Sequence, residues 1–240
     1  MLKHRLLFLV VASLLWGGIA TLPGSSRAQD ATPAGAPAAG EKSTAIVVSA
    51  TNDPLRVAGS DGLDHLEYDL LVTNAFAAPV TLTSIAVTAP DGESLLSLDA
   101  DALAAVTQRL LGRTPAAEIP ASGTVAVVMD VTVPPGRALE SLGHHITYEV
   151  APDAPVRALL GSYAIDGPQL PVDPRPVTVI APPVRGDGWL ANSGCCAAAS
   201  IHRAVRVPVD GARIGKQETF AIDFARLRDG EPYSGDGARP

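Results

Sequence analysis

The sequence predicts a mainly β protein, built as an antiparallel β-sandwich with one short helix and followed by an incomplete β segment. Between residues 44 and 150, several segments alternate apolar and polar residues with a period of two, which is typical of strands with one buried face. Pro-Asp-Gly at 90–92 and Pro-Pro-Gly at 134–136 supply turns between them. One segment alone has helical spacing. We therefore expect two packed sheets rather than a helical or α/β fold.

The candidate strands follow one another at short intervals. They are residues 45–48, 66–72, 80–88, 125–133 and 146–150. In the second of these, Leu66, Tyr68 and Leu70 would face the core, whereas Glu67 and Asp69 would face away. Residues 74–79 turn the chain toward the third strand. Strands at this spacing are typical of immunoglobulin-like sandwiches, and because no paired cysteines lie here, the likeness is one of architecture.

The single predicted helix interrupts the strands after residue 98. Asp99 is placed to cap its first turn, and Leu103, Val106 and Leu110 share one face. Gly112 follows the last turn, as a helix-ending glycine does. We expect this helix to cover one end of the hydrophobic core.

The N-terminus has the order of a secretory signal peptide over residues 1–28. A basic start with Lys3 and Arg5 precedes an apolar run over residues 6–19, and Ser26 and Ala28 offer the small residues of a cleavage site. The alternative, a membrane anchor, needs about 20 apolar residues, more than this run supplies. The sequence therefore predicts an exported protein, periplasmic or extracellular, without a membrane span after cleavage.

The charge and aromatic content of the exported chain indicate which classes of molecule it is expected to bind. Residues 1–28 contain three basic and no acidic residues, so their removal changes the formal net charge from −7 to −10. An acidic chain with few aromatic residues has no affinity for a phosphate backbone, so nucleic acid is not an expected partner. An envelope protein fits the predicted compartment better.

Composition also divides the chain into segments. Residues 29–43 form an Ala/Pro/Gly linker that we expect to be disordered, and residues 44–164 form the sandwich. Residues 165–185 are proline-rich and predict an extended connector with one edge strand over residues 177–180. Residues 186–240 form a separate C-terminal segment.

Side chains able to hold a metal gather in the C-terminal segment. Cys195, Cys196, His202 and Asp223 are all zinc-ligand types, although their spacing matches neither a zinc finger nor a zinc ribbon. Alternatively, His202 is a surface histidine and Asp223 a strand-edge carboxylate. For the adjacent cysteines we weigh a strained disulfide with each other in an oxidising compartment. The alternatives are free thiols, intermolecular bonds, metal ligation, and a catalytic cysteine using His202 as base.

Other histidines point to structural roles. His144 and His145 are consecutive in a predicted strand, so their side chains point to opposite faces and cannot share one metal ion. His65 follows Asp61 and Asp64, whose spacing does not support a calcium site.

Residues 186–240 resemble the opening of a lysostaphin-type (glycyl-glycine endopeptidase) zinc metallopeptidase domain. Phe220-Ala221-Ile222-Asp223-Phe224 is similar to the element that supplies an aspartate zinc ligand in that family, which makes Asp223 the corresponding residue. The preceding Cys-Cys, His-Arg and Asp-Gly pairs are similar to the lead-in of one branch. The resemblance implies a zinc cofactor and cell-wall peptides as the substrate class, with the sandwich as an N-terminal accessory region.

The same segment departs from the family at its other ligands. Thr219 stands where the family places a histidine, and no histidine follows His202 in these 240 residues. A catalytic zinc needs about three protein ligands and a base for its water, so we expect a truncated, catalytically incomplete peptidase-like segment with Asp223 and His202 as candidate ligands and no catalytic residue assigned. The alternative function is a non-enzymatic binding module of the periplasm or the cell exterior.

Overall fold

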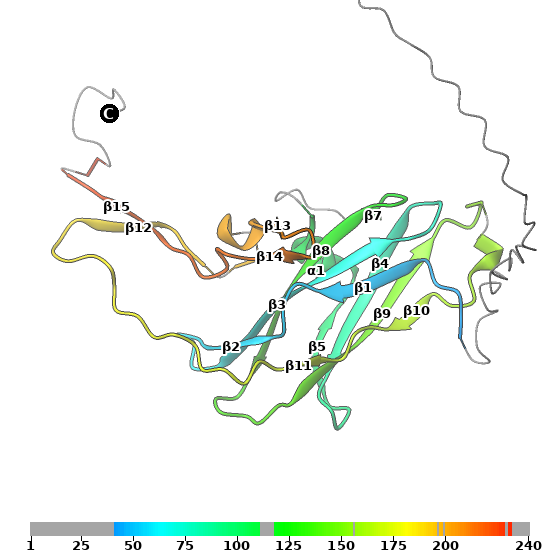
Figure 1. Ribbon diagram of the computed structural model, residues 1–240, viewed down its shortest axis with the longest axis horizontal. Coiled ribbons are helices and arrows are strands. Elements are labelled where there is room, and N and C mark those ends of the chain that lie inside the picture. Colours follow the sequence, from blue (N-terminus) through cyan, green and yellow to red (C-terminus); the bar gives the residue numbers. More distant parts are fainter. Residues whose placement is uncertain are drawn as a thin grey trace, which may run out of the picture. The chain divides into compact units, whose positions relative to one another are not determined.

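The computed structural model describes residues 41–110, 118–155, 157–195, 197–198, 200–228 and 230–231, which belong to one compact unit over residues Gly40–Pro240 (Figure 1). The predicted signal peptide, most of the predicted linker, Gly112 and Cys196 lie outside these residues. In the described part of the chain, no helix has the length and apolarity that crossing a bilayer requires.

Two antiparallel sheets make up the sandwich. Sheet A has the strand order β1-β3-β8-β6, with β2 also paired to β3. Its strands are β1 (Ile46–Ala50), β2 (Leu55–Ala58), β3 (Asp64–Asn74), β6 (Thr107–Arg109) and β8 (Thr124–Val133). Sheet B has the order β10-β9-β4-β5, with β11 paired to β9 and β7 paired to β4. Its strands are β4 (Val80–Thr88), β5 (Ser94–Leu98), β7 (Glu118–Ile119), β9 (Ser141–Val150), β10 (Ala164–Asp166) and β11 (Leu170–Pro171).

The inner faces of both sheets supply one hydrophobic core. It contains Leu66, Tyr68, Leu70 and Val72 from β3, alternate residues of β8, and inward residues of β4 and β9 such as Ile85 and Ile146. The predicted mainly β antiparallel sandwich is therefore confirmed. In β4 the alternation breaks between Leu82 and Ser84, where a bulge against β9 restores the inward position to Ile85.

Two buried polar side chains of the sandwich, Asn74 and His144, are hydrogen-bonded within it. The Asn74 amide nitrogen donates to the carbonyl oxygens of Ala78 and Ile119 at 2.8 and 3.0 Å, which fixes the turn between β3 and β4. His144 is buried and its Nδ1 donates to the Pro168 carbonyl at 2.7 Å, so that Nε2 can accept from the Tyr68 hydroxyl at 2.8 Å. His145 is exposed beside Asp166, as the strand alternation predicts.

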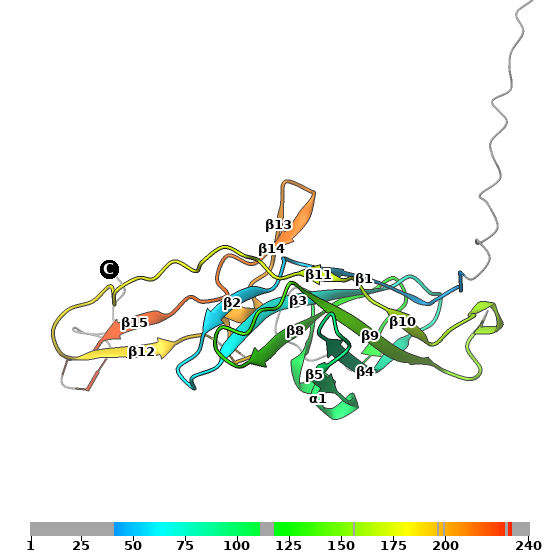
Figure 2. The same cartoon turned by 90° about the horizontal axis from the view of Figure 1, so that it is seen from below.

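The predicted helix is present but shorter than expected. α1 (Ala100–Val106) begins after Asp99, whose carboxylate accepts from the Ala102 amide at 2.9 Å, and packs beside β4, β5 and β8 (Figure 2). The expected extension to Leu110 is wrong, because Thr107 is extended and begins β6. Pairing of β6 with Val125–Val127 of β8 satisfies backbone groups that further helical turns would have used.

The proline-rich region also differs from its prediction. Its first part joins sheet B, because β10 and β11 both pair with β9. The expected strand over residues 177–180 is absent, and Val179 there is 91% exposed.

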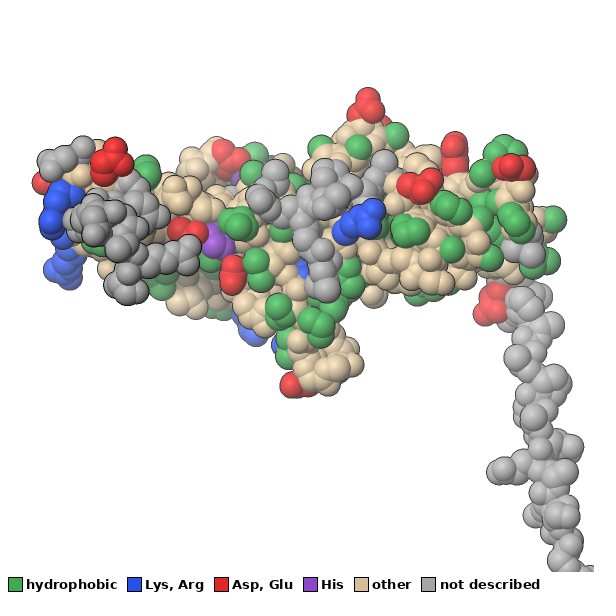
Figure 3. Space-filling model, turned by 90° about the horizontal axis from the view of Figure 1, so that it is seen from above, with side chains coloured by type: hydrophobic (Ala, Val, Ile, Leu, Met, Phe, Trp, Pro, Cys, Tyr) green, Lys and Arg blue, Asp and Glu red, His purple; other side chains and the backbone are tan. Residues whose placement is uncertain are grey.

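The C-terminal segment forms two two-stranded sheets, one of β12 (Trp189–Ser193) with β15 (Asp223–Arg226) and one of β13 (Val207–Val209) with β14 (Arg213–Gly215). Figure 3 shows acidic side chains spread among hydrophobic and polar ones on one face.

Candidate metal and ion-pair site of the C-terminal segment

The outer face of sheet A is covered where sequence reasoning expected it to be open. Glu67 and Asp69 of β3 point away from the core, yet they are only 2% and 0% exposed. The covering residues come from the C-terminal segment, where Arg203 belongs to the 3₁₀ turn η2 (His202–Ala204) and Arg206 follows it. The expected solvent-facing side of β3 is therefore a buried interface.

A network of buried ion pairs holds this interface together. The Arg203 guanidinium pairs with Glu67, Arg206 Nε lies 2.7 Å from Asp69 Oδ2, and Lys216 Nζ lies 2.6 Å from Asp69 Oδ1. A pair of hydrogen bonds extends the network, since Gln108 of β6 accepts from Arg206 at 3.2 Å and donates to the Ala198 carbonyl at 2.8 Å. Because buried charges are costly unless paired, these contacts fix one position of the segment on the sheet.

The network holds more positive than negative charge. Arg203, Arg206 and Lys216 face the two carboxylates of Glu67 and Asp69. Burial, followed by repulsion from Arg206, lowers the pKa of Arg203 to about 10. Burial also lowers the pKa of Lys216 to about 8, despite the attraction of Asp69. Of these two cations, the lysine gives up its proton more readily.

The two predicted metal ligands lie next to each other. His202 is at the start of η2 and Asp223 is the first residue of β15, and His202 Nε2 lies 3.2 Å from Asp223 Oδ2. On the other side of the ring, His202 Nδ1 lies 3.1 Å from Glu218 Oε2. The His202 side chain is 9% exposed, whereas Glu218 and Asp223 are 46% and 59% exposed. The hydrogen bond to Glu218, together with the charge of Asp223, raises the pKa of His202.

This arrangement fits two zinc ligands and a supporting carboxylate. His202 Nε2 is buried and makes no hydrogen bond with the described residues, although a carboxylate oxygen lies 3.2 Å away. Glu218 on Nδ1 holds the ring in the orientation and tautomer that leave Nε2 free to bind a metal. Sequence reasoning did not single out Glu218. Thr219, in the position where the family resemblance places a histidine, is buried and offers no third strong ligand.

A second group of ligand-type side chains shares Glu67 with the ion network. His65, Glu67 and Asp130 each place one ligand atom within 4.8 Å of the others. His65 is already held by Asp130 at 2.8 Å and by Asp61 at 3.2 Å, and Glu67 is paired with Arg203. Although partial burial alone would lower it, these carboxylates raise the pKa of His65. All three side chains of this group therefore already have partners within the protein.

The predicted cysteine pair is described only in part. Cys195 takes part in a disulfide, and Cys196 lies outside the described residues. Ser200 donates from its hydroxyl to the Gly194 carbonyl at 2.6 Å, which closes the turn that carries Cys195. The pairing of Cys195 with Cys196 stays a prediction.

Comparisons with known proteins give little further guidance. No protein-family profile matches the chain, and no curated protein matches it. Among solved structures, the X-ray structure of Northeast Structural Genomics Consortium target SoR45 is similar at 11% identity, with a TM-score of 0.32. The similarity covers 59% of this chain and 97% of that one.

Proposed function

We propose that this chain is the exported accessory portion of a cell-wall metallopeptidase-like protein, and that its C-terminal segment contributes two zinc ligands, His202 and Asp223. The observation that carries the proposal is the 3.2 Å approach of His202 Nε2 to Asp223 Oδ2, with Glu218 on the other ring nitrogen. A metal ligand histidine that donates to a carboxylate is a common arrangement around zinc. The resemblance of residues 220–224 to the aspartate element of lysostaphin-type peptidases points to the same ion.

The described residues would bind zinc without supporting catalysis. Zinc in a peptidase polarises the peptide carbonyl and lowers the pKa of a bound water. Here His202 would bind through Nε2, Asp223 would neutralise charge, and Glu218 would orient the imidazole. The part of the chain that the structure describes brings no third strong ligand and no separate base to this site, so we expect no peptide hydrolysis from the 240-residue chain alone.

Zinc binding by the purified secreted chain tests the proposal. Isothermal titration should detect a zinc site that Asp223→Asn and His202→Gln each weaken at least tenfold. Glu218→Ala should weaken it about tenfold, because it removes only the supporting hydrogen bond. His145→Gln is the matched control, since His145 is an exposed histidine beside a carboxylate on sheet B.

Two results would contradict the proposal in different ways. Absence of zinc binding, or equal binding by the parent and the Asp223→Asn variant, removes the zinc site. Because Asp223 is exposed, that variant should fold normally, and circular dichroism checks this. Zinc-dependent cleavage of a cell-wall peptide by the chain alone would instead leave the zinc site in place and overturn its catalytic incompleteness.

A further inference from the structure

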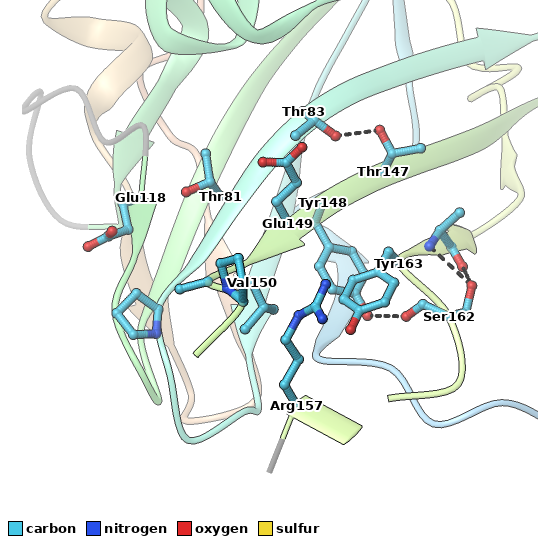
Figure 4. A pocket seen from close by; sticks show the side chains of 14 residues that line it. Thr81, Thr83, Glu118, Thr147, Tyr148, Glu149, Val150, Arg157, Ser162 and Tyr163 are labelled. Carbon is cyan, nitrogen blue, oxygen red and sulfur yellow. Dashed lines mark hydrogen bonds between the residues drawn. The ribbon is translucent and has the colours of Figure 1, made fainter. Parts of the chain in front are cut away.

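A separate groove lies over the outer face of sheet B. Its floor is formed by outward residues of β4 and β9, including Thr81, Thr147 and Glu149, and its volume is about 840 Å³. Figure 4 shows Glu118 of β7 on one side and Arg157 with Tyr163 on the other. A groove of this size accommodates a small ligand. None of its residues belongs to the C-terminal ion-pair site.

The charged groups of this groove have no ion-pair partner among the residues that the structure describes. The Arg157 guanidinium lies 5.0 Å from the Tyr163 ring centroid, and its buried Nε meets no hydrogen-bond acceptor in that part of the chain. Among the described residues, neither this guanidinium nor the carboxylates of Glu118 and Glu149 takes part in an ion pair. Every arginine and lysine of the sheet A network, by contrast, has a carboxylate partner. An oriented arginine without an acceptor is suited to a carboxylate ligand, because its planar donors match two oxygens.

The positions of the charged residues in the groove indicate which ligand groups would bind where. An anionic group would bind at Arg157, whereas a cationic group would bind near Glu118 and Glu149. Threonine hydroxyls on the floor can donate to and accept from amide groups, and Thr83 and Thr147 are already hydrogen-bonded to each other at 2.6 Å. One face of Tyr163 is covered by Arg157, and Tyr148 packs against the ring with centroids 5.9 Å apart. That ring is therefore poorly placed to stack on a sugar.

We propose that this groove binds a short peptide with free termini, with its carboxylate at Arg157 and its amino group facing Glu118 and Glu149. The proposal does not depend on the zinc site, because the two share no residue. It would give the sandwich a peptide-binding role of its own.

Nuclear magnetic resonance titration of the ¹⁵N-labelled secreted chain with trialanine tests the proposal. Trialanine should shift the backbone amides of Thr81, Thr147 and Glu149. Amidation of its C-terminus should weaken binding about tenfold, because it removes a charge-assisted contact. Acetylation of its N-terminus should weaken binding by a smaller factor, since Glu118 and Glu149 are both solvent-exposed.

Variants assign these effects to individual residues. Arg157→Gln should make the free-acid and amidated peptides bind equally weakly, whereas Arg157→Lys should keep part of the preference for the free acid. Arg175→Gln, which alters an arginine paired with Asp173 outside the groove, should change nothing. Equal binding of both peptides by the parent, shifts confined to other residues, or no shifts at millimolar trialanine would each overturn the proposal.

Discussion

The outer faces of the two sheets differ in burial, although the strands of both sheets show the same alternation of inward and outward residues. On sheet A, the outward residues Glu67 and Asp69 are buried under arginines of the C-terminal segment. On sheet B, the outward residues Thr81 and Thr147 line a groove that remains open. Alternation in a strand therefore identifies the core face but does not establish that the other face is exposed.

The chemistry of the outward residues accounts for this difference. Carboxylates on β3 require cations once they are covered, and the C-terminal segment supplies Arg203, Arg206 and Lys216. Threonine hydroxyls are satisfied by their neighbours, as Thr147 is by Thr83 and Ser84 at 2.6 Å each. Hydroxyl groups such as that of Thr147 therefore need no covering cations, and this face can remain open to solvent and to a ligand.

The largest expected loss of unfolding free energy comes from removing one partner of a buried ion pair on sheet A. Arg203→Met leaves Glu67 buried without its partner, and removing one member of a buried pair costs about 3–5 kcal/mol of unfolding free energy. Denaturant unfolding followed by circular dichroism measures the loss. The double variant Glu67→Gln/Arg203→Met should recover most of it, because no uncompensated charge remains. A change of less than about 0.5 kcal/mol in the single variant would show that the interface is solvated.

A smaller change in unfolding free energy, one that depends on pH, should follow from the excess positive charge of the same network. Because the folded-state pKa of Lys216 is about 8, below the ordinary value of 10.5, the unfolded chain binds more protons between these values. The contribution of Lys216 to stability should therefore rise as pH increases from about 8 to 10.5, by on the order of 2 kcal/mol. Unfolding free energies of the parent and of Lys216→Met at pH 7.5 and 10 measure this contribution. If the difference between the two proteins is the same at both pH values, the lysine is not perturbed.

Local patterns predicted the sandwich but not what covers it. Alternation placed Leu66, Tyr68 and Leu70 in the core, and the side chain of Asp99 predicted the start of α1. The end of α1 was missed because β6 pairs with β8, a contact between segments that helical spacing does not encode. Asp69 and Arg206 are 137 residues apart in sequence, so no local signal indicated their contact.

The candidate site was predictable in composition but not in arrangement. Residue type and family resemblance selected His202 and Asp223, and the fold places them 3.2 Å apart. Glu218 lies five residues before Asp223, and a search for a carboxylate partner of the histidine could have found it. The groove over sheet B had no such signal, because Arg157 and Tyr163 reach its wall through the chain between β9 and β10.

The smallest expected effect concerns the open face of sheet B and sharpens the contrast with sheet A. Thr147→Val removes a hydroxyl shared by Thr83 and Ser84, both of which are only partly buried and can bind water instead. We expect a loss of about 1 kcal/mol in unfolding free energy, within the range for one neutral hydrogen-bonding group. Thr132→Val, on the outer face of sheet A in a position exposed to solvent, is the matched control and should change stability by less than about 0.5 kcal/mol. A loss at Thr147 as large as that from Arg203→Met would mean that the two outer faces do not differ in the way that their chemistry implies.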